Sequence, residues 1–85
     1  MAGTFHLSIL TPEQGVYEGE VEYVQAPGGE GYFGVLPHHA PLVSTLGEGV
    51  LRVRESGGAE TRWQIAGGFF EVSNNRATVL ADAVG

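Results

Sequence analysis

The chain has 85 residues, a formal net charge of −6 and no cysteine. This length allows one domain with a core of modest size, and the lack of cysteine excludes disulfides, thiolate metal sites and cysteine nucleophiles. Ten acids stand against four scattered arginines and no lysine, a balance that disfavours nucleic acid and anionic lipid surfaces as partners. No apolar run approaches the roughly 20 residues of a membrane helix, so we expect any membrane association to be indirect, through another protein.

The first part of the chain alternates apolar and polar residues, the pattern of half-buried strands. Residues 5–9 and residues 20–23 both show this period of two. Residues 30–42 then place two prolines, two glycines and two histidines around a short apolar run. Proline pushes the residue before it out of the helical region, so this segment predicts a strand, a corner and a second strand.

The second part of the chain repeats the alternation at residues 51–54 and 62–65. Glycine and asparagine tolerate the positive φ of tight turns, so residues 56–59 and residues 74–75 predict two hairpin turns. Phe69 and Phe70 are adjacent and must point to opposite faces of their strand. We therefore expect one of the two rings on the outer surface.

No window has helical spacing with caps, and fourteen glycines disfavour long helices. Short strands separated by turn signals predict an all-β fold, a β-sandwich of two antiparallel sheets with about ten short strands and no substantial helix. We expect residues 1–85 to form this single domain.

Several ordered blocks resemble a known family. Glu30–Leu42 reads Glu-Gly-Tyr-Phe-Gly-Val-Leu-Pro-His-His-Ala-Pro-Leu, preceded by Phe5–Glu13 and Val21–Gly28 and followed by Ile65–Phe69, Glu71–Val72 and Asn75–Asp82. Together they are similar to the amino-terminal domain of the epsilon subunit of F-type ATP synthases, called delta in mitochondria. The resemblance implies a non-catalytic subunit without a cofactor, on the cytoplasmic face of a bacterial inner membrane.

The resemblance also implies two partners within the central stalk, the gamma subunit and the membrane c-ring, between which the subunit couples proton transport to ATP synthesis. The positions that match the family's gamma contact are Thr11, His39, Leu42, Ser44 and Leu46. The positions that match its c-ring contact are Glu30, Gly31 and Tyr32. An apolar patch around an exposed phenylalanine would suit such a partner surface.

In the family the sandwich is followed by a helical hairpin, which restrains ATP hydrolysis in many members. This sequence ends where that hairpin would begin, and the sequence leaves open whether the protein is naturally short or an excised domain. The expectation is a subunit that couples without inhibiting and does not bind ATP.

Other functions would require particular arrangements of these residues. Adjacent His38 and His39 point to opposite sides of an extended chain and do not chelate one metal together, and a hydrolase would need His39 beside Ser44. A free-standing β-sandwich ligand-binding module would need Trp63 and Tyr32 as an exposed aromatic pair. Residues 28–31 lack the lysine and helix of a phosphate loop, and the alternating acids at 18, 20 and 22 suit a solvated strand face.

Overall fold

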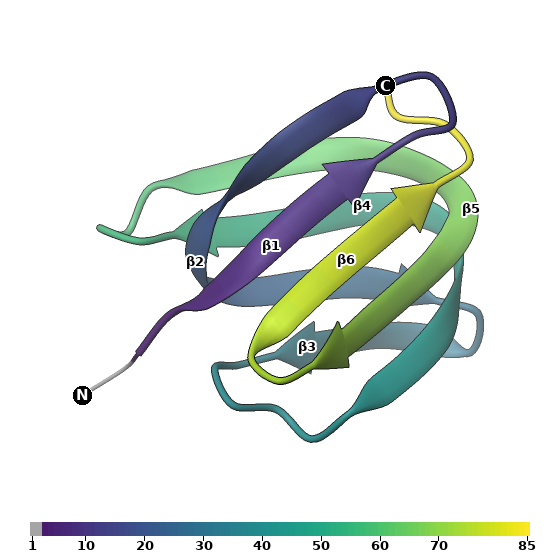
Figure 1. Ribbon diagram of the computed structural model, residues 1–85. Helices are drawn as coiled ribbons and strands as arrows, with labels where there is room; N and C mark the ends of the chain where they lie inside the picture. Colours follow the sequence, from purple (N-terminus) through teal and green to yellow (C-terminus); the bar gives the residue numbers. More distant parts are fainter. Residues whose placement is uncertain (1–2) are drawn as a thin grey trace.

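The computed structural model describes residues 3–85 and contains six strands (Figure 1). Met1 and Ala2, part of the predicted domain, lie outside the described residues. The strands are β1 (Phe5–Leu10), β2 (Gly15–Gly28), β3 (Gly31–Val35), β4 (Leu42–Glu55), β5 (Glu60–Ser73) and β6 (Arg76–Ala81). The described residues contain no helix, and the predicted all-β class is confirmed.

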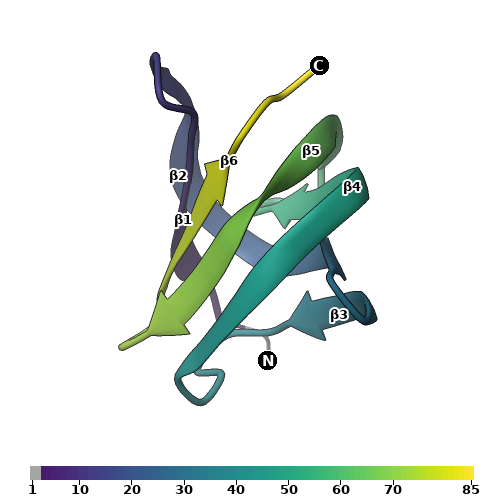
Figure 2. The same ribbon diagram turned by 90° about the vertical axis from the view of Figure 1, so that its right-hand side faces the viewer.

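The strands form one sheet in the order β1-β6-β5-β4-β2-β3, and a further β1–β2 pairing closes five of them into a flattened barrel. All pairs are antiparallel except β1 with β6. The prediction of about ten short strands in two antiparallel sheets is therefore wrong. The reason is that β2, β4 and β5 have 14 residues each and bend continuously from one layer of the barrel to the other, as Figure 2 shows for β4 and β5.

Two layers face each other across the core. The first layer contains β1, β6, the first halves of β2 and β4 and the second half of β5. The second contains β3, the second halves of β2 and β4, and the first half of β5. The bend of β5 lies at Gly67 and Gly68, which have φ of 75° and 126°. A Cβ on Gly68 would overlap the carbonyl oxygen of Leu80, so only glycine fits there.

Inward-pointing residues alternate along every strand and fill the space between the layers. The predicted apolar face of β1, namely Phe5, Leu7 and Ile9, is fully buried. Phe70 is buried with its ring 5.2 Å from that of Phe33 in an edge-on contact. Phe69 is 55% exposed, which confirms that the two adjacent phenylalanines separate between core and surface.

Both predicted hairpin turns are present, between β4 and β5 and between β5 and β6. Asn74 and Asn75 have φ of 51° and 61°, the left-handed geometry of a tight hairpin turn. The Asn75 side chain accepts a hydrogen bond from His38 N (2.8 Å) and donates one to Thr4 O (2.9 Å). It thereby fixes the proline-rich corner, where His38 has φ of 64°.

The last residues pair with the first half of β5. Val84 forms a β-bridge with Ile65, and Gly85 N donates to Gln64 O at 2.8 Å. Within residues 3–85, no helix is long and apolar enough to cross a membrane.

Candidate partner-binding surfaces

The predicted c-ring residues lie at the β2–β3 hairpin. Gly29 and Glu30 form its exposed turn, and Gly31 begins β3 beside it, with φ of 134° and no heavy atom within 4 Å of a Cβ built on it. Gly29 N donates to Thr45 O at 3.1 Å, which ties the hairpin to β4. The tip is therefore open to a partner while its base is held by the sheet.

Tyr32 is 54% exposed, yet its hydroxyl has a defined structural contact: it accepts a hydrogen bond from Val50 N at 3.0 Å. The β2–β4 register explains this contact, because it is interrupted between Gln25 and Gly28 and leaves part of β4 out of the ladder. Tyr32 supplies the acceptor that β2 does not. A Cβ on Gly49 would lie 2.5 Å from this hydroxyl, so glycine is needed where Tyr32 reaches β4.

The predicted gamma-contact residues on β4 point inward rather than outward. Leu42, Ser44 and Leu46 are the register partners of Val72, Phe70 and Gly68. Leu46 is only 6% exposed and belongs to the core, so the expectation that it is a surface residue is wrong. Its alternation with outward-facing residues was readable from the sequence, but which face of the strand meets the core was not.

Leu42 and Ser44 lie in a groove that the β2–β3 hairpin also lines. The groove contains Glu30, Gly31 and Tyr32 on one wall, and Leu42 to Thr45 on the other. The structure thus brings the predicted c-ring residues together with two of the predicted gamma residues.

Thr11 and His39 lie apart from that groove. Thr11 is in the β1–β2 turn, where its backbone N donates to Gln14 O at 2.9 Å. His39 is in the proline-rich corner, with Nδ1 2.7 Å from Ala40 O. The five predicted gamma residues therefore do not form one continuous surface.

The outer face of the first layer carries an exposed apolar strip, which we define as Leu10, Leu80, Phe69 and Val43. The register places Leu10 beside Leu80, and Leu80 beside Phe69. Val43 is two residues from Thr45, the β4 partner of Phe69, on the same face. Phe69, Leu80 and Val43 are 55%, 50% and 70% exposed. Thr11 and Pro12 adjoin the Leu10 end of the strip.

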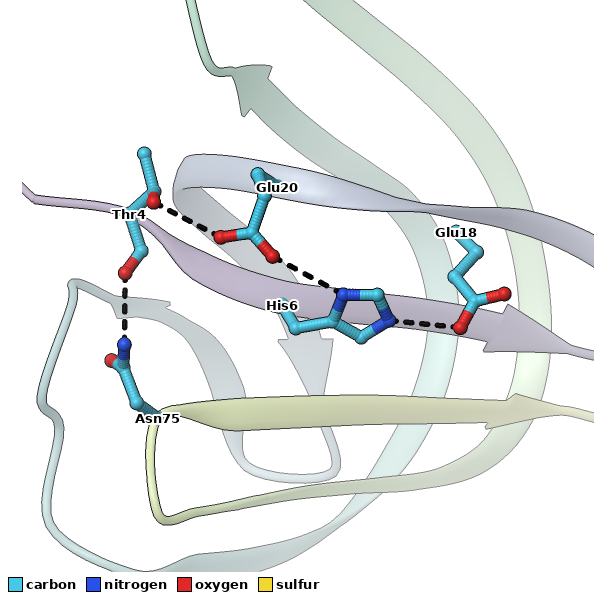
Figure 3. Close-up of polar contacts among 5 residues, drawn as sticks. All are labelled: Thr4, His6, Glu18, Glu20 and Asn75. Atoms are coloured by element: carbon cyan, nitrogen blue, oxygen red, sulfur yellow. Dashed lines mark hydrogen bonds and ion pairs between the residues drawn. The ribbon is translucent and has the colours of Figure 1, made fainter.

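A polar cluster that the sequence did not predict lies on β1 and β2 (Figure 3). The His6 ring lies between Glu18 and Glu20, with Nε2 2.9 Å from Glu18 Oε2 and Nδ1 3.3 Å from Glu20 Oε2. Thr4 Oγ1 donates to the other oxygen of Glu20 at 3.0 Å. The predicted solvated face is therefore partly a side-chain network that ties β1 to β2.

The arrangement does not assemble the alternative sites among the described residues. Ser44 Oγ donates to Thr45 O and His39 Nδ1 faces Ala40 O, so neither contacts the other. Residues 3–85 contain no cluster of three side chains suited to a metal. The Trp63 ring packs against Tyr17, 5.3 Å between centroids, rather than against Tyr32. Burial raises the pKa of Tyr17, with a smaller effect from nearby Glu55.

Comparison with known proteins identifies relatives along almost the whole chain. Residues 4–84 match the family described as ATP synthase, Delta/Epsilon chain, beta-sandwich domain. The ATP synthase epsilon chain of Desulfitobacterium hafniense is 49% identical over 82 residues, and that of Desulforamulus reducens is 50% identical over 82 residues. Each alignment covers 96% of this chain and 61% of the relative, so the chain spans about three fifths of the length of these relatives.

Solved structures share the fold. A chain in the cryo-EM structure of Euglena gracilis mitochondrial ATP synthase (OSCP, F1 and c-ring) superposes with a TM-score of 0.91 at 24% identity, over 96% of this chain and 52% of that one. A chain of the Tetrahymena thermophila mitochondrial ATP synthase central stalk and c-ring gives a TM-score of 0.82 at 14% identity, over 99% of this chain and 67% of that one.

Proposed function

Because the chain belongs to the family of the ATP synthase delta/epsilon β-sandwich domain, we propose that it serves as the epsilon subunit of an F-type ATP synthase central stalk. In this role it is not catalytic and uses no cofactor. It joins the gamma subunit to the c-ring and rotates with them as proton transport is coupled to ATP synthesis. The observation that carries the proposal is the match over residues 4–84, together with about 50% identity to bacterial epsilon chains.

The gamma subunit binds, in this proposal, at the apolar strip of the first layer. Three large apolar side chains that are half or more exposed on so small a domain favour a protein partner. Thr11 extends the strip at its Leu10 end. Leu42, Ser44 and His39 take part from the groove and the corner, whereas Leu46 supports the contact from the core.

The c-ring binds at the tip of the β2–β3 hairpin, through Glu30 and Gly31. Tyr32 contributes its exposed ring while its hydroxyl holds the hairpin to β4. Because close-packed interiors deform little, a hairpin fixed in this way transmits torque from the ring to the strip.

The proposed location follows from these partners. The subunit is peripheral and reaches the membrane only through the complex, on the cytoplasmic face of a bacterial inner membrane. The relatives in Desulfitobacterium and Leptospira are bacterial epsilon chains, which favours this location over an organelle.

Two experiments test the two contacts separately: cross-linking for the c-ring and a charge substitution for the gamma subunit. Cysteine introduced at Glu30 should cross-link to a ring subunit in the assembled complex, whereas cysteine at Ala59, in the β4–β5 turn at the other end of the domain, should not. Phe69→Glu should bind the gamma subunit more weakly than the native chain does. The matched control is Gln64→Glu, which adds the same charge on an exposed site of the second layer. Equal ring cross-linking at Glu30 and Ala59 removes the hairpin assignment, and equal gamma binding by both glutamate variants removes the strip assignment.

A further inference from the structure

The outer face of the second layer gathers most of the positive charge of an acidic protein. Register places Gln25 beside Arg52, and Arg52 beside Arg62. The next row contains Arg54 beside Glu60. We define Arg52, Arg54 and Arg62 as the arginine face. It carries three of the chain's four basic residues, so the sequence-based assumption that the arginines are scattered is wrong.

The arginine side chains are ordered by contacts across the strands. Arg52 Nε and Arg62 Nε both donate to the same oxygen, Glu60 Oε2, at 3.1 and 3.2 Å. Arg52 also donates through its NH1 nitrogen to Gln25 Oε1 at 3.0 Å, and the Arg54 guanidinium lies 5.9 Å from the centre of the Tyr23 ring. The hydrogen bond from Arg62, and then the charges of Arg52 and Arg62, hold the pKa of Glu60 below its usual range. One carboxylate thus binds two of the three guanidinium groups on this face.

Two nearby acids on β4, Glu55 and Glu48, do not neutralise this excess. Glu55 follows Arg54 and points to the other face, where it accepts a hydrogen bond from Thr61 Oγ1 at 2.6 Å. Glu48 shares the outer face of β4 but lies four residues from Arg52, about 13 Å along an extended strand. That distance exceeds the Debye length of about 8 Å at physiological salt. The three guanidinium groups against the single carboxylate of Glu60 therefore leave the arginine face with an excess of positive charge.

We propose that the arginine face binds an acidic segment of a partner protein, whose carboxylates pair with the Arg52 and Arg62 guanidiniums. Charge complementarity favours an acidic peptide segment over other ligands. Guanidinium and carboxylate make charge-assisted hydrogen bonds of matching geometry, and arginines already held in place lose less freedom on binding. The rest of the surface is acidic, which disfavours nucleic acid and an anionic membrane. The face lies on the opposite layer from the apolar strip, so both surfaces can be occupied at once. This inference goes beyond the proposed stalk function and does not depend on it.

The test is a titration of the purified chain with a hexaglutamate peptide, followed by NMR of the arginine Nε–H signals, with hexalysine as the control peptide. Binding of hexaglutamate should weaken by about tenfold in the double variant R52Q/R62Q, because two charge-assisted contacts are lost. R76Q is the matched control, since Arg76 is the basic residue outside this face, and it should change affinity by less than about twofold. Circular dichroism checks that each variant is folded.

A second variant tests whether hexaglutamate binds the Arg52 and Arg62 guanidiniums themselves rather than responding to the overall charge of the chain. Glu60→Gln removes the internal carboxylate that occupies Arg52 and Arg62, so it should strengthen hexaglutamate binding. The proposal is overturned if R76Q weakens binding as much as R52Q/R62Q, if Glu60→Gln weakens it, or if hexalysine binds equally well. It is also overturned if the face binds only phosphatidylglycerol vesicles, or only a second copy of the chain in sedimentation.

Discussion

The hydroxyl of Tyr32 can be removed without changing the shape of the ring, which makes Tyr32→Phe a direct test of how the β2–β3 hairpin is held. In the native chain this hydroxyl accepts the Val50 N–H at 3.0 Å, at a place where β4 has no ladder partner on β2. Phenylalanine leaves that donor without its acceptor. The variant should therefore be less stable, and its hairpin should open more often.

The magnitude follows from the burial of the donor. A typical intramolecular hydrogen bond contributes about 0.5–1.5 kcal/mol net, and an orphaned buried donor costs about 1–3 kcal/mol. Val50 is half-buried and Tyr32 is 54% exposed, so water reaches part of the site and the lower values apply. We expect a loss of about 1 kcal/mol. For a domain of this size that loss lowers Tm by about 4–8 °C.

Thermal unfolding followed by circular dichroism gives the Tm, and amide hydrogen exchange reports on Val50 directly. Tyr17→Phe is the control, because the structure gives the Tyr17 hydroxyl no hydrogen bond within residues 3–85. It should change stability by less than about 0.5 kcal/mol. If Tyr32→Phe matches Tyr17→Phe in Tm and Val50 exchange stays at the native rate, the hydroxyl does not hold the hairpin and the reasoning is refuted.

Three further substitutions test the core, the β5 bend and the charged network. Phe70→Ala should cost about 3–5 kcal/mol because it empties a fully buried site, and a urea midpoint equal to the native one would contradict this. Gly68→Ala should cost at least about 3 kcal/mol, since φ of 126° and the Leu80 carbonyl oxygen leave no room for a Cβ; a native circular dichroism melt would show that the bend tolerates a side chain. The pKa of Glu60 is lowered in the folded chain, so its contribution is present above the usual glutamate value of about 4.5 and is lost as pH falls through the lowered value. Glu60→Gln should therefore show a smaller loss of Tm below pH 4.5 than the native chain, and identical losses would contradict the ion pairing.

Local patterns were enough to predict the all-β class, several extended segments and the two hairpin turns, because period-two alternation and the asparagine and glycine turns act over a few residues. The predicted number of strands was wrong because long strands that bend were counted as separate short ones. A Gly-Gly pair such as Gly67–Gly68 is compatible with a break between two strands, but glycine also lets one strand bend and continue. The sequence does not distinguish these outcomes, since what decides is the pairing of β5 with β4 and β6.

The candidate surfaces depended still more on tertiary packing. Alternation showed that Phe69 and Phe70 must separate, but the sequence did not say which is outside. The exposure of Phe69 follows from the closure of the barrel, which buries Phe70 against Phe33. Likewise, Arg52 lies beside Arg62 because of the β4–β5 register. The turn at 56–59 sets that register, and the positions of the arginines in the sequence do not reveal it.

ATP-driven proton pumping tests most directly whether this chain couples the c-ring to the gamma subunit, as we propose. The assay uses membranes carrying a bacterial F-type ATP synthase from which the epsilon subunit has been removed, with pumping followed by quenching of a pH-sensitive dye. We expect the added 85-residue chain to restore pumping, and the Phe69→Glu variant to restore it less well than Gln64→Glu. Pumping that stays at the level of the depleted membranes, although the chain is folded and present in excess, would contradict the account.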